Sequence, residues 1–356
     1  MALPVPDSVA APRRSTLERM PKWLICVPLV MQWLWLGLRH GGMSLPSAAN
    51  PAITSGGLVG ETKLEYFASM GTLALAATAR HCALPPQARE SPAAVREELA
   101  RAGIGFPLVA KPDLGMCGFG VRRIDSNGEL ADYIAAFPQR QTIVLQEYLA
   151  EEGEAGIFYA RDPGASQGRI IGLALRDFPR VRGDGMSTID QLIARDPRAS
   201  RVRRAGHAVA LDGARIPAAG EQVRLATIGS TRVGGLYRDG GGCITPALSS
   251  GIDAIAQDME QFHFGRFDVR FADVDALRRG EVKIMEVNGA GSEAIEAWDP
   301  GTGIARAFGI IFAKQRTLFA IAAANRRRGH RPIGLWKLAQ LHWTQQKLLD
   351  TYPHSN

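Results

Sequence analysis

Apolar and polar positions divide most of the chain into strand-like and helix-like segments that follow one another. Short apolar runs bounded by turn formers predict strands at 107–111, 142–149, 154–161, 168–176, 265–271 and 281–287. Longer segments with helical spacing predict helices from residue 91, at 130–137, at 303–327 and at 334–352. Strands in pairs, with helices between them, favour an α+β fold with lobes over a strictly alternating parallel sheet.

Residues 23–38 form one uncharged, apolar stretch that carries three tryptophans and lies between Lys22 and Arg39. The stretch is shorter than the ~20 residues that a membrane-spanning helix needs, and Pro28 is expected to interrupt it. Two alternatives stay open. The stretch is either a buried N-terminal helix or a helix that lies in the membrane interface with its tryptophans at head-group depth.

Composition and charge limit the class of protein. The 356 residues carry a formal net charge of +7, which fits an anionic partner such as nucleotide phosphate, lipid head groups or nucleic acid. The basic run 326–331 reads as a solvated helix end, and no nucleic-acid-binding module accompanies it. The four cysteines form no CxxC pair, which predicts a reduced, cytoplasmic protein without zinc; they are Cys26, Cys82, Cys117 and Cys243.

A lysine followed by glycines marks the first candidate for binding chemistry, in "FPLVAKPDLGMCGFGV" at 106–121. The strand delivers Lys111, and the loop after it contains Gly115, Gly118 and Gly120. Glycines let backbone N–H groups approach phosphate oxygens, and a lysine at the strand end meets the same charge. The order differs from that of a Walker A loop, and alone the segment also fits a simple hairpin.

Polar residues also end the strand at 142–149. Gln146, Glu147, Tyr148 and Leu149 would offer backbone donors and acceptors beside an apolar wall, as an adenine ring requires, and Glu154 could accept hydrogen bonds from ribose hydroxyls. The alternative is an acidic surface turn.

Two predicted strands carry oxygen-bearing side chains on one face. In "KIMEVNGAGS", Glu286 and Asn288 are two residues apart, and so they point the same way from a strand. If this strand pairs with "GRFDVRF", Asp268 lies beside them. Three oxygen ligands suit Mg²⁺, although a solvated strand end is the alternative.

Together these segments resemble the ATP-grasp superfamily, and within it the carboxylate–amine ligases such as D-alanine–D-alanine ligase and the ATP-binding part of cyanophycin synthetase. "VRGDGMSTIDQLI" at 181–193 is similar to a segment of the cyanophycin-synthetase group. The resemblance covers about residues 60–320. It implies two α+β lobes that clamp ATP: a central lobe at 91–149 and a C-terminal lobe with the metal site at 150–325. A short, atypical N-terminal region, 1–90, precedes them, and a basic helical tail, 326–356, follows.

The resemblance also implies roles for individual residues. Lys111 and the glycines contact ATP phosphates, residues 146–149 hold adenine, and Glu154 takes the ribose. Asp268, Glu286 and Asn288 hold one or two Mg²⁺ ions, for which Mn²⁺ is a substitute. Arg266 stabilises a tetrahedral intermediate, Arg182 or Arg180 is a second phosphate-binding residue, and Lys63 matches a further lysine of the nucleotide site.

The implied reaction activates a small-molecule carboxylate as an acyl phosphate, which an amine or similar nucleophile then attacks. Backbone N–H groups at 289–292 would form an oxyanion hole, and the glycine-rich loop 232–248 a mobile cover. The alternatives are an ATP-grasp kinase, which leaves a phosphorylated product, and a non-catalytic nucleotide-binding protein at the membrane. The sequence names neither the substrates nor the oligomeric state.

Overall fold

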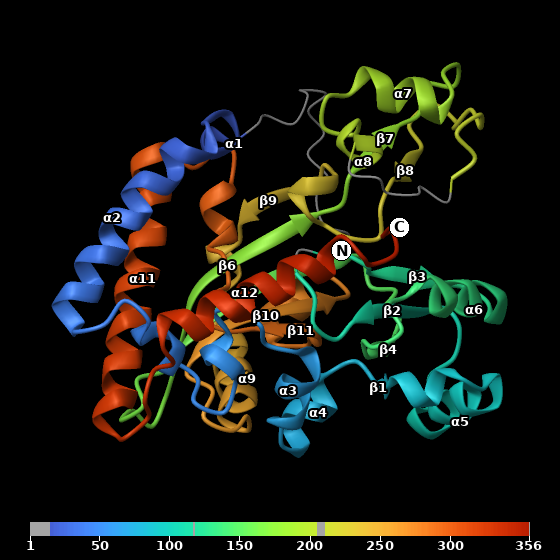
Figure 1. Cartoon of the computed structure of the whole chain (residues 1–356). Helices are drawn as coiled ribbons and strands as arrows, with labels where there is room; N and C mark the ends of the chain where they lie inside the picture. Colours follow the sequence, from blue (N-terminus) through green and yellow to red (C-terminus); the bar gives the residue numbers. More distant parts are fainter. Residues whose placement is uncertain (1–14, 117, 205–210, 356) are drawn as a thin grey trace.

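Two antiparallel sheets organise the computed structural model, which describes residues 15–116, 118–204 and 211–355 (Figure 1). The larger sheet has the strand order β11-β10-β5-β6-β9, and the smaller one has the order β1-β4-β2-β3. The α+β class with two lobes, expected from the sequence, is confirmed. The strands of the larger sheet are β5 (Gly153–Ala160), β6 (Arg169–Asp177), β9 (Leu236–Asp239), β10 (Phe264–Phe271) and β11 (Lys283–Asn288); those of the smaller are β1 (His81–Leu84), β2 (Leu108–Pro112), β3 (Arg122–Ile124) and β4 (Ile143–Glu147).

One face of the larger sheet is apolar and forms the main core. Strand alternation puts Ile157, Phe267 and Val269 on this face, where they pack with helices that precede β5 in the chain and helices that follow β9. These helices are α3 (Lys63–Ala68), α4 (Thr72–Ala77), α9 (Pro246–Gln257) and α10 (Val274–Arg279). The same alternation turns Asp268 and its neighbours to the opposite face.

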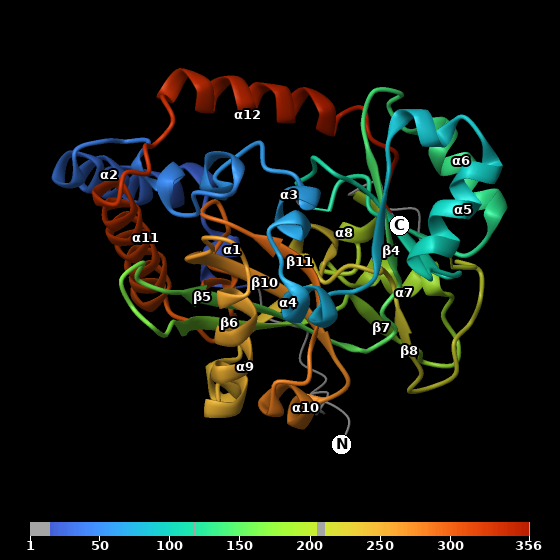
Figure 2. The same ribbon diagram turned by 90° about the horizontal axis from the view of Figure 1, so that it is seen from below.

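Two long helices flank the larger sheet, α2 (Lys22–His40) and α11 (Ile304–Arg327), and they lie side by side in both views (Figures 1 and 2). Trp33 contacts Phe319 edge-on with ring centroids 5.0 Å apart, and Gln32 donates to the carbonyl of Phe312. The expected interruption at Pro28 is wrong, because α2 continues through it. Proline removes one backbone hydrogen bond there without ending the helix. The short helices nearby are α1 (Thr16–Arg19), η1 (Leu45–Ala48), η2 (Thr54–Gly57) and η6 (Ile295–Trp298).

The smaller sheet carries α5 (Pro92–Ala102) and α6 (Asn127–Ala136) and has its own apolar core. The helix predicted from residue 91 forms: Ser91 caps α5, and Pro92 occupies its first turn. The boundary at residue 90 cuts through this lobe, because β1 and η3 (Pro86–Arg89) precede it. The N-terminal region is also not a unit by itself, since α3 and α4 belong to the core of the larger sheet.

Residues 180–233 form a small projection with a separate core, visible beyond β6 in Figure 1. It contains β7 (Arg180–Arg182), α7 (Ile189–Arg195), α8 (Arg201–Arg204), β8 (Gln222–Arg224) and η4 (Thr231–Val233). The loop expected at 232–248 instead contains β9, which pairs with β6, and η5 (Gly241–Cys243). The tail forms α12 (Leu335–Leu349), which crosses the molecule toward the smaller sheet (Figure 2).

Candidate functional site

The three proposed metal ligands lie together on the polar face of the larger sheet. Asp268 is directly opposite Glu286 in the β10–β11 register, and Asn288 is opposite Arg266. Asn288 Nδ2 donates to Asp268 Oδ2 over 3.1 Å. The strand pairing expected from the sequence therefore forms and brings two carboxylates and one amide onto one surface.

Two arginines surround Asp268. Arg266 Nε donates to one carboxylate oxygen over 2.6 Å and its terminal nitrogen to the other over 3.0 Å, while Arg176 reaches Asp268 from β6 over 2.9 Å. Burial acts to raise the pKa of Asp268, but the guanidinium groups of Arg176 and Arg266 outweigh burial and lower it. Asp268 is thus an anion held in a buried cationic setting.

Glu286 meets two lysines, one from each part of the site. Lys63 Nζ is 3.3 Å from Glu286 Oε1, and Lys111 of the smaller sheet donates to the carbonyl of Met285 over 3.1 Å. Burial lowers the pKa of Lys111 to about 8, although Glu286 acts to raise it. The contacts of Lys111 join the two sheets at the point where the candidate metal ligands lie.

The glycine-rich loop after Lys111 lies next to this pair. A Cβ atom at Gly115 would be 3.3 Å from Lys63 Nζ, so the loop passes directly over the ammonium group. Gly118 and Gly120 both have positive φ, at 75° and 71°. An L side chain is strained there, which explains the glycines at both positions. Cys117, directly before Gly118, lies outside the described residues.

The C-terminal segment anchors this same loop. Gln345 Nε2 donates to Gly115 O over 3.3 Å, Tyr352 to Leu114 O over 2.6 Å and Ser355 to Gly118 O over 2.7 Å. The ring of Tyr352 also stacks on Phe137 of the smaller lobe. The predicted tail is therefore part of the site's architecture.

The proposed adenine hinge is only partly open. β4 is an inner strand of the smaller sheet, paired with β1 and β2, so the backbone of Gln146 and Glu147 is already engaged. The N–H of Glu147 donates to Arg80 O over 2.8 Å, and Gln146 Oε1 accepts from Lys111 over 2.7 Å. Only Tyr148 and Leu149 lie beyond the paired residues of β4, so the expectation of four open backbone positions is wrong for the first two.

Glu154 and Arg182 are placed differently from expectation. Glu154 is 5% exposed, and its carboxylate oxygens contact Arg176 at 3.0 Å and Arg270 at 3.3 Å. Glu154 therefore holds Arg176 and Arg270 in place on the polar face. A ribose hydroxyl that donates to Glu154 would have to displace these arginines from its carboxylate. Arg182 is exposed on β7, and among the described residues it shares no hydrogen bond or ion pair with Asp268 or Glu286. The structure places Arg176, and not Arg182, next to Asp268; the phosphate-binding role expected for Arg182 or Arg180 stays a prediction.

The turn after Asn288 is closed by another glycine segment. The N–H of Ala290 donates to Gly56 O over 3.0 Å, and the N–H of Gly291 to Gly57 O over 2.6 Å. A Cβ atom on Gly57 would lie 2.6 Å from Gly289 Cα, so glycine is required for this contact. The expected oxyanion hole at 289–292 is thus wrong for these two N–H groups, which already have acceptors, and for that of Ser292, which donates to Gly289 O.

Two residues beside this turn have no role assigned from the sequence. Glu61 is half-buried, and burial raises its pKa to about 7; its buried Oε2 has no hydrogen-bond partner among the described residues. The hydroxyl of Tyr66 likewise lies buried without a partner there. Both lie close to Glu286, which affects their pKa values, and an unpaired buried carboxyl oxygen beside a charged cluster is typical of a functional site.

The donor set fits a hard divalent cation. Asp268 and Glu286 are ionised carboxylates and Asn288 carries an amide oxygen, the ligands that Mg²⁺ takes with water and phosphate. Arginine and lysine now neutralise both carboxylates, so these cations and a metal ion would share the same negative charge. Lys111 and Lys63 place positive charge beside the glycine loop, as the binding of a triphosphate would require.

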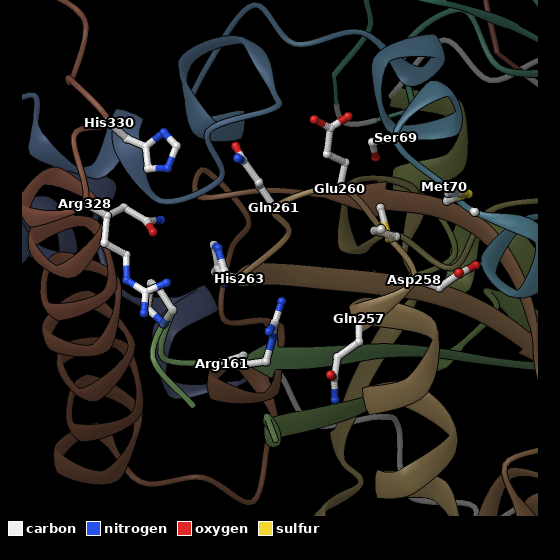
Figure 3. Close-up of a pocket in the computed structure, with 14 residues that line it drawn as sticks. Ser69, Met70, Arg161, Gln257, Asp258, Glu260, Gln261, His263, Arg328 and His330 are labelled. Carbon is white, nitrogen blue, oxygen red and sulfur yellow. The ribbon is translucent and has the colours of Figure 1, made fainter. Parts of the chain in front are cut away.

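A polar pocket of about 630 Å³ lies beyond the start of β10, away from these residues (Figure 3). Arg161, His263 and Arg328 gather on one side of it. Burial, with Arg161 and Arg328, lowers the pKa of His263 to about 4, so this imidazole is neutral. Glu260 and Asp258 belong to the other side.

Sequence reasoning missed Arg176, Arg270 and the tail contacts. Arg176 ends the apolar run "IIGLAL", and Arg270 is two residues after Asp268, so strand alternation could have placed both on the polar face. The contacts of Gln345, Tyr352 and Ser355 depend on tertiary packing, and no local pattern marks them.

Comparisons with known proteins give a distant likeness. No family model and no curated protein matches the sequence. Among solved structures, the chain is similar to a bifunctional glutathione synthetase from Pasteurella multocida, with 16% identity over 74% of this chain and 38% of that chain and a TM-score of 0.36. It is also similar to D-alanine–D-alanine ligase from Bacillus anthracis, with 15% identity over 76% of this chain and 69% of that chain and a TM-score of 0.42. VanG D-Ala:D-Ser ligase from Enterococcus faecalis is similar too, with 15% identity over 71% of this chain and 61% of that chain and a TM-score of 0.39. The chain spans 38% of the length of the first of these. At such TM-scores the likeness does not decide an activity, which depends on the residues described above.

Proposed function

We propose that this protein is a Mg·ATP-dependent ligase of the ATP-grasp type, which activates a small-molecule carboxylate and joins it to an amine or similar nucleophile. The observation that carries the proposal is the meeting of the two lobes. Lys111 from the smaller sheet reaches the β11 backbone beside Glu286, opposite Asp268. Cationic and anionic groups thus face each other where a triphosphate and its metal ion would lie.

The chain's own residues suit phosphoryl transfer from ATP to a carboxylate. Lys111 and Lys63 would bind phosphate oxygens beside the loop at 113–121, and Tyr148 and Leu149 would bound the adenine. Asp268, Glu286 and Asn288 would hold Mg²⁺, which supplies charge neutralisation at the phosphates when it is bound. The acyl phosphate that forms then loses phosphate as the second nucleophile attacks its carbonyl carbon.

Arg266 and Arg176 are the groups best placed to stabilise developing negative charge. Both are largely buried and fixed by Asp268, so little reorganisation is needed when charge forms nearby. Because the N–H groups of Ala290 and Gly291 have acceptors, we assign the oxyanion role to these guanidinium groups.

An ATP-grasp kinase is the alternative reaction on the same site. A ligase releases ADP and phosphate and needs a second nucleophile, whereas a kinase leaves a stable phosphorylated product. Analysis of the product in the presence and absence of an amine distinguishes them.

The test is a screen for ADP release over panels of carboxylates and amines with Mg²⁺. We expect Glu286→Ala to lower the rate with an active pair by at least about a hundredfold, the size of effect typical for a group that stabilises transition-state charge. Glu281→Ala is the matched control, because Glu281 lies exposed just before the same strand, and among the described residues its carboxylate pairs with Arg279 alone. Equal rates for Glu286→Ala and wild type would refute the metal assignment.

A further inference from the structure

The outer side of α2 is the largest run of exposed apolar side chains among the described residues. Trp23 is 67% exposed, Met31 65% and Leu38 76%. All eight members recur at intervals of three and four residues, so they form one stripe on the helix. We call them the α2 stripe: Trp23, Leu24, Val27, Val30, Met31, Leu34, Trp35 and Leu38.

The opposite side of α2 is already occupied. Ile25 and Leu36 are buried, and Gln32 and Trp33 fix the helix on α11 and the segment after α2. The α2 stripe therefore faces away from the protein, at the edge of the molecule in both views (Figures 1 and 2). Exposed apolar surface of this extent marks an interaction site.

Basic groups gather at one end of the α2 stripe. Arg39 lies over the ring of Trp35 at 5.3 Å, and Arg326 donates to His40 O and Gly41 O. Burial, Arg39, Arg326 and Arg327 together lower the pKa of His40, which shows how closely these charges approach. Among the described residues none of the three arginines forms an ion pair. Lys22 and Arg19 add exposed positive charge at the other end.

Negative charge is absent from both helices of this side. Neither α2 nor α11 contains an aspartate or glutamate. An apolar stripe with tryptophans, bounded by arginine and lysine, matches the interface of an anionic bilayer: apolar side chains enter the acyl boundary, tryptophans lie at head-group depth and basic groups meet phosphates.

We propose that the α2 stripe docks the protein on anionic phospholipid membranes, with α2 lying in the plane of the interface. The helix does not span the bilayer, because its other side remains on α11. The basic cluster of Arg39, Arg326 and Arg327 orients the contact toward phosphate head groups. This proposal is independent of the ligase reaction, since none of its residues belongs to the nucleotide site.

The test is co-sedimentation of the full chain with vesicles of phosphatidylcholine alone or with about one third phosphatidylglycerol. We expect binding to the anionic vesicles, weaker binding to the neutral ones, and weakening by salt. Trp23→Ser with Val27→Ser and Trp35→Ser should lower the vesicle affinity at least about tenfold. The control pair, Met186→Ser with Ile216→Ser, removes two exposed apolar side chains from the projection at 180–233 and should leave binding unchanged.

The unfolding temperature of the triple variant and its stabilisation by Mg·ATP report whether the fold and nucleotide site are intact. If both are kept and vesicle binding is lost, the proposal is supported. It is overturned if the wild type stays in the supernatant with both kinds of vesicle. It is also overturned if the wild type is a dimer that the triple variant dissociates, because the stripe would then bind a second copy of this chain.

Discussion

At the scale of single residues, buried charge is concentrated around Asp268. Its carboxylate contacts Arg176, Arg266 and the amide of Asn288, and all are largely withdrawn from solvent. Ion pairs of this kind add little when intact, yet removing one partner leaves an uncompensated buried charge. Asp268 therefore contributes to stability as well as to the proposed metal site.

We expect Asp268→Asn to lower the free energy of unfolding by about 3–5 kcal/mol, because it leaves the Arg266 guanidinium without its counter-charge and Arg176 with Glu154 alone. Urea unfolding at neutral pH measures this. The control Asp125→Asn breaks the exposed pair with Arg123 and should cost less than about 1 kcal/mol. Equal losses for both variants would contradict the account of the buried network.

The pH dependence of this contribution has a defined sign. The arginines hold the pKa of Asp268 below its ordinary value, so the stabilisation is present above the unfolded-state pKa of about 3.9. It is lost as the pH falls through the lower, folded-state pKa. The difference in stability between wild type and Asp268→Asn should accordingly shrink in acid.

Lys111 provides a second prediction at this scale, for ATP affinity. Its pKa of about 8 means that the ammonium group loses its charge as the pH rises through this value. Because phosphate attracts the charged form, we expect ATP affinity without metal to fall by up to about tenfold per pH unit above 8. Lys111→Arg keeps the charge and should flatten the profile, which calorimetric titration can measure. A wild-type profile that stays flat above pH 8 would exclude Lys111 as the phosphate contact.

At the scale of elements, the alternation of side chains along the strands predicted which face of the sheet the site residues share. The sequence did not predict how the strands and the tail pack around that face. The period of two placed Asp268, Glu286 and Asn288 on one face before their pairing was known. It held because residues 266–268 pair regularly with residues 286–288, and the register shift comes only after Asp268. The same reasoning could not show that β1 closes one edge of β4. That pairing joins residues far apart in sequence, and no local property of 142–149 distinguishes an inner strand from an edge strand.

The tail is the element whose role the sequence concealed. The sequence of the tail predicts only an amphipathic helix. In the structure Gln345, Tyr352 and Ser355 of the tail hold the glycine loop by hydrogen bonds to its backbone carbonyls. Single hydrogen bonds of this type carry no sequence pattern, since any donor at the right place would serve. The tail and the loop are thus one structural unit.

We expect Tyr352→Phe to raise the hydrogen-exchange rate of the loop 113–121 by roughly fivefold, which corresponds to the ~1 kcal/mol of one hydrogen bond. The ring and its stacking on Phe137 remain, so only the bond to Leu114 O is lost. Thr344→Ala, which removes a bond within exposed α12, is the control. Unchanged exchange in the loop would show that the tail does not hold it.

At the scale of the whole molecule, the proposed nucleotide site is divided between two lobes. Lys111 and the glycine loop belong to the smaller sheet, whereas Asp268, Glu286 and Asn288 belong to the larger one. The lobes also meet where Ala79 N–H donates to Ile284 O over 2.9 Å, just before the chain enters β1. A ligand that contacts both parts would couple them, because the proposed phosphate contact Lys111 and the proposed metal ligands lie on different sheets.

We therefore expect Mg²⁺ and ATP together to stabilise the protein by more than the sum of their separate effects. At about a hundredfold excess over the dissociation constant, a ligand specific for the folded state adds ~2.7 kcal/mol. Thermal unfolding with Mg²⁺, with ATP and with both measures the coupling, which is reciprocal between the two ligands. Glu286→Gln should remove the excess and keep the effect of ATP alone, whereas Lys111→Ala should reduce both. Strictly additive effects in the wild type would mean that metal and phosphate bind at separate places. That result would refute the proposal that one site between the two lobes binds Mg²⁺ and ATP together.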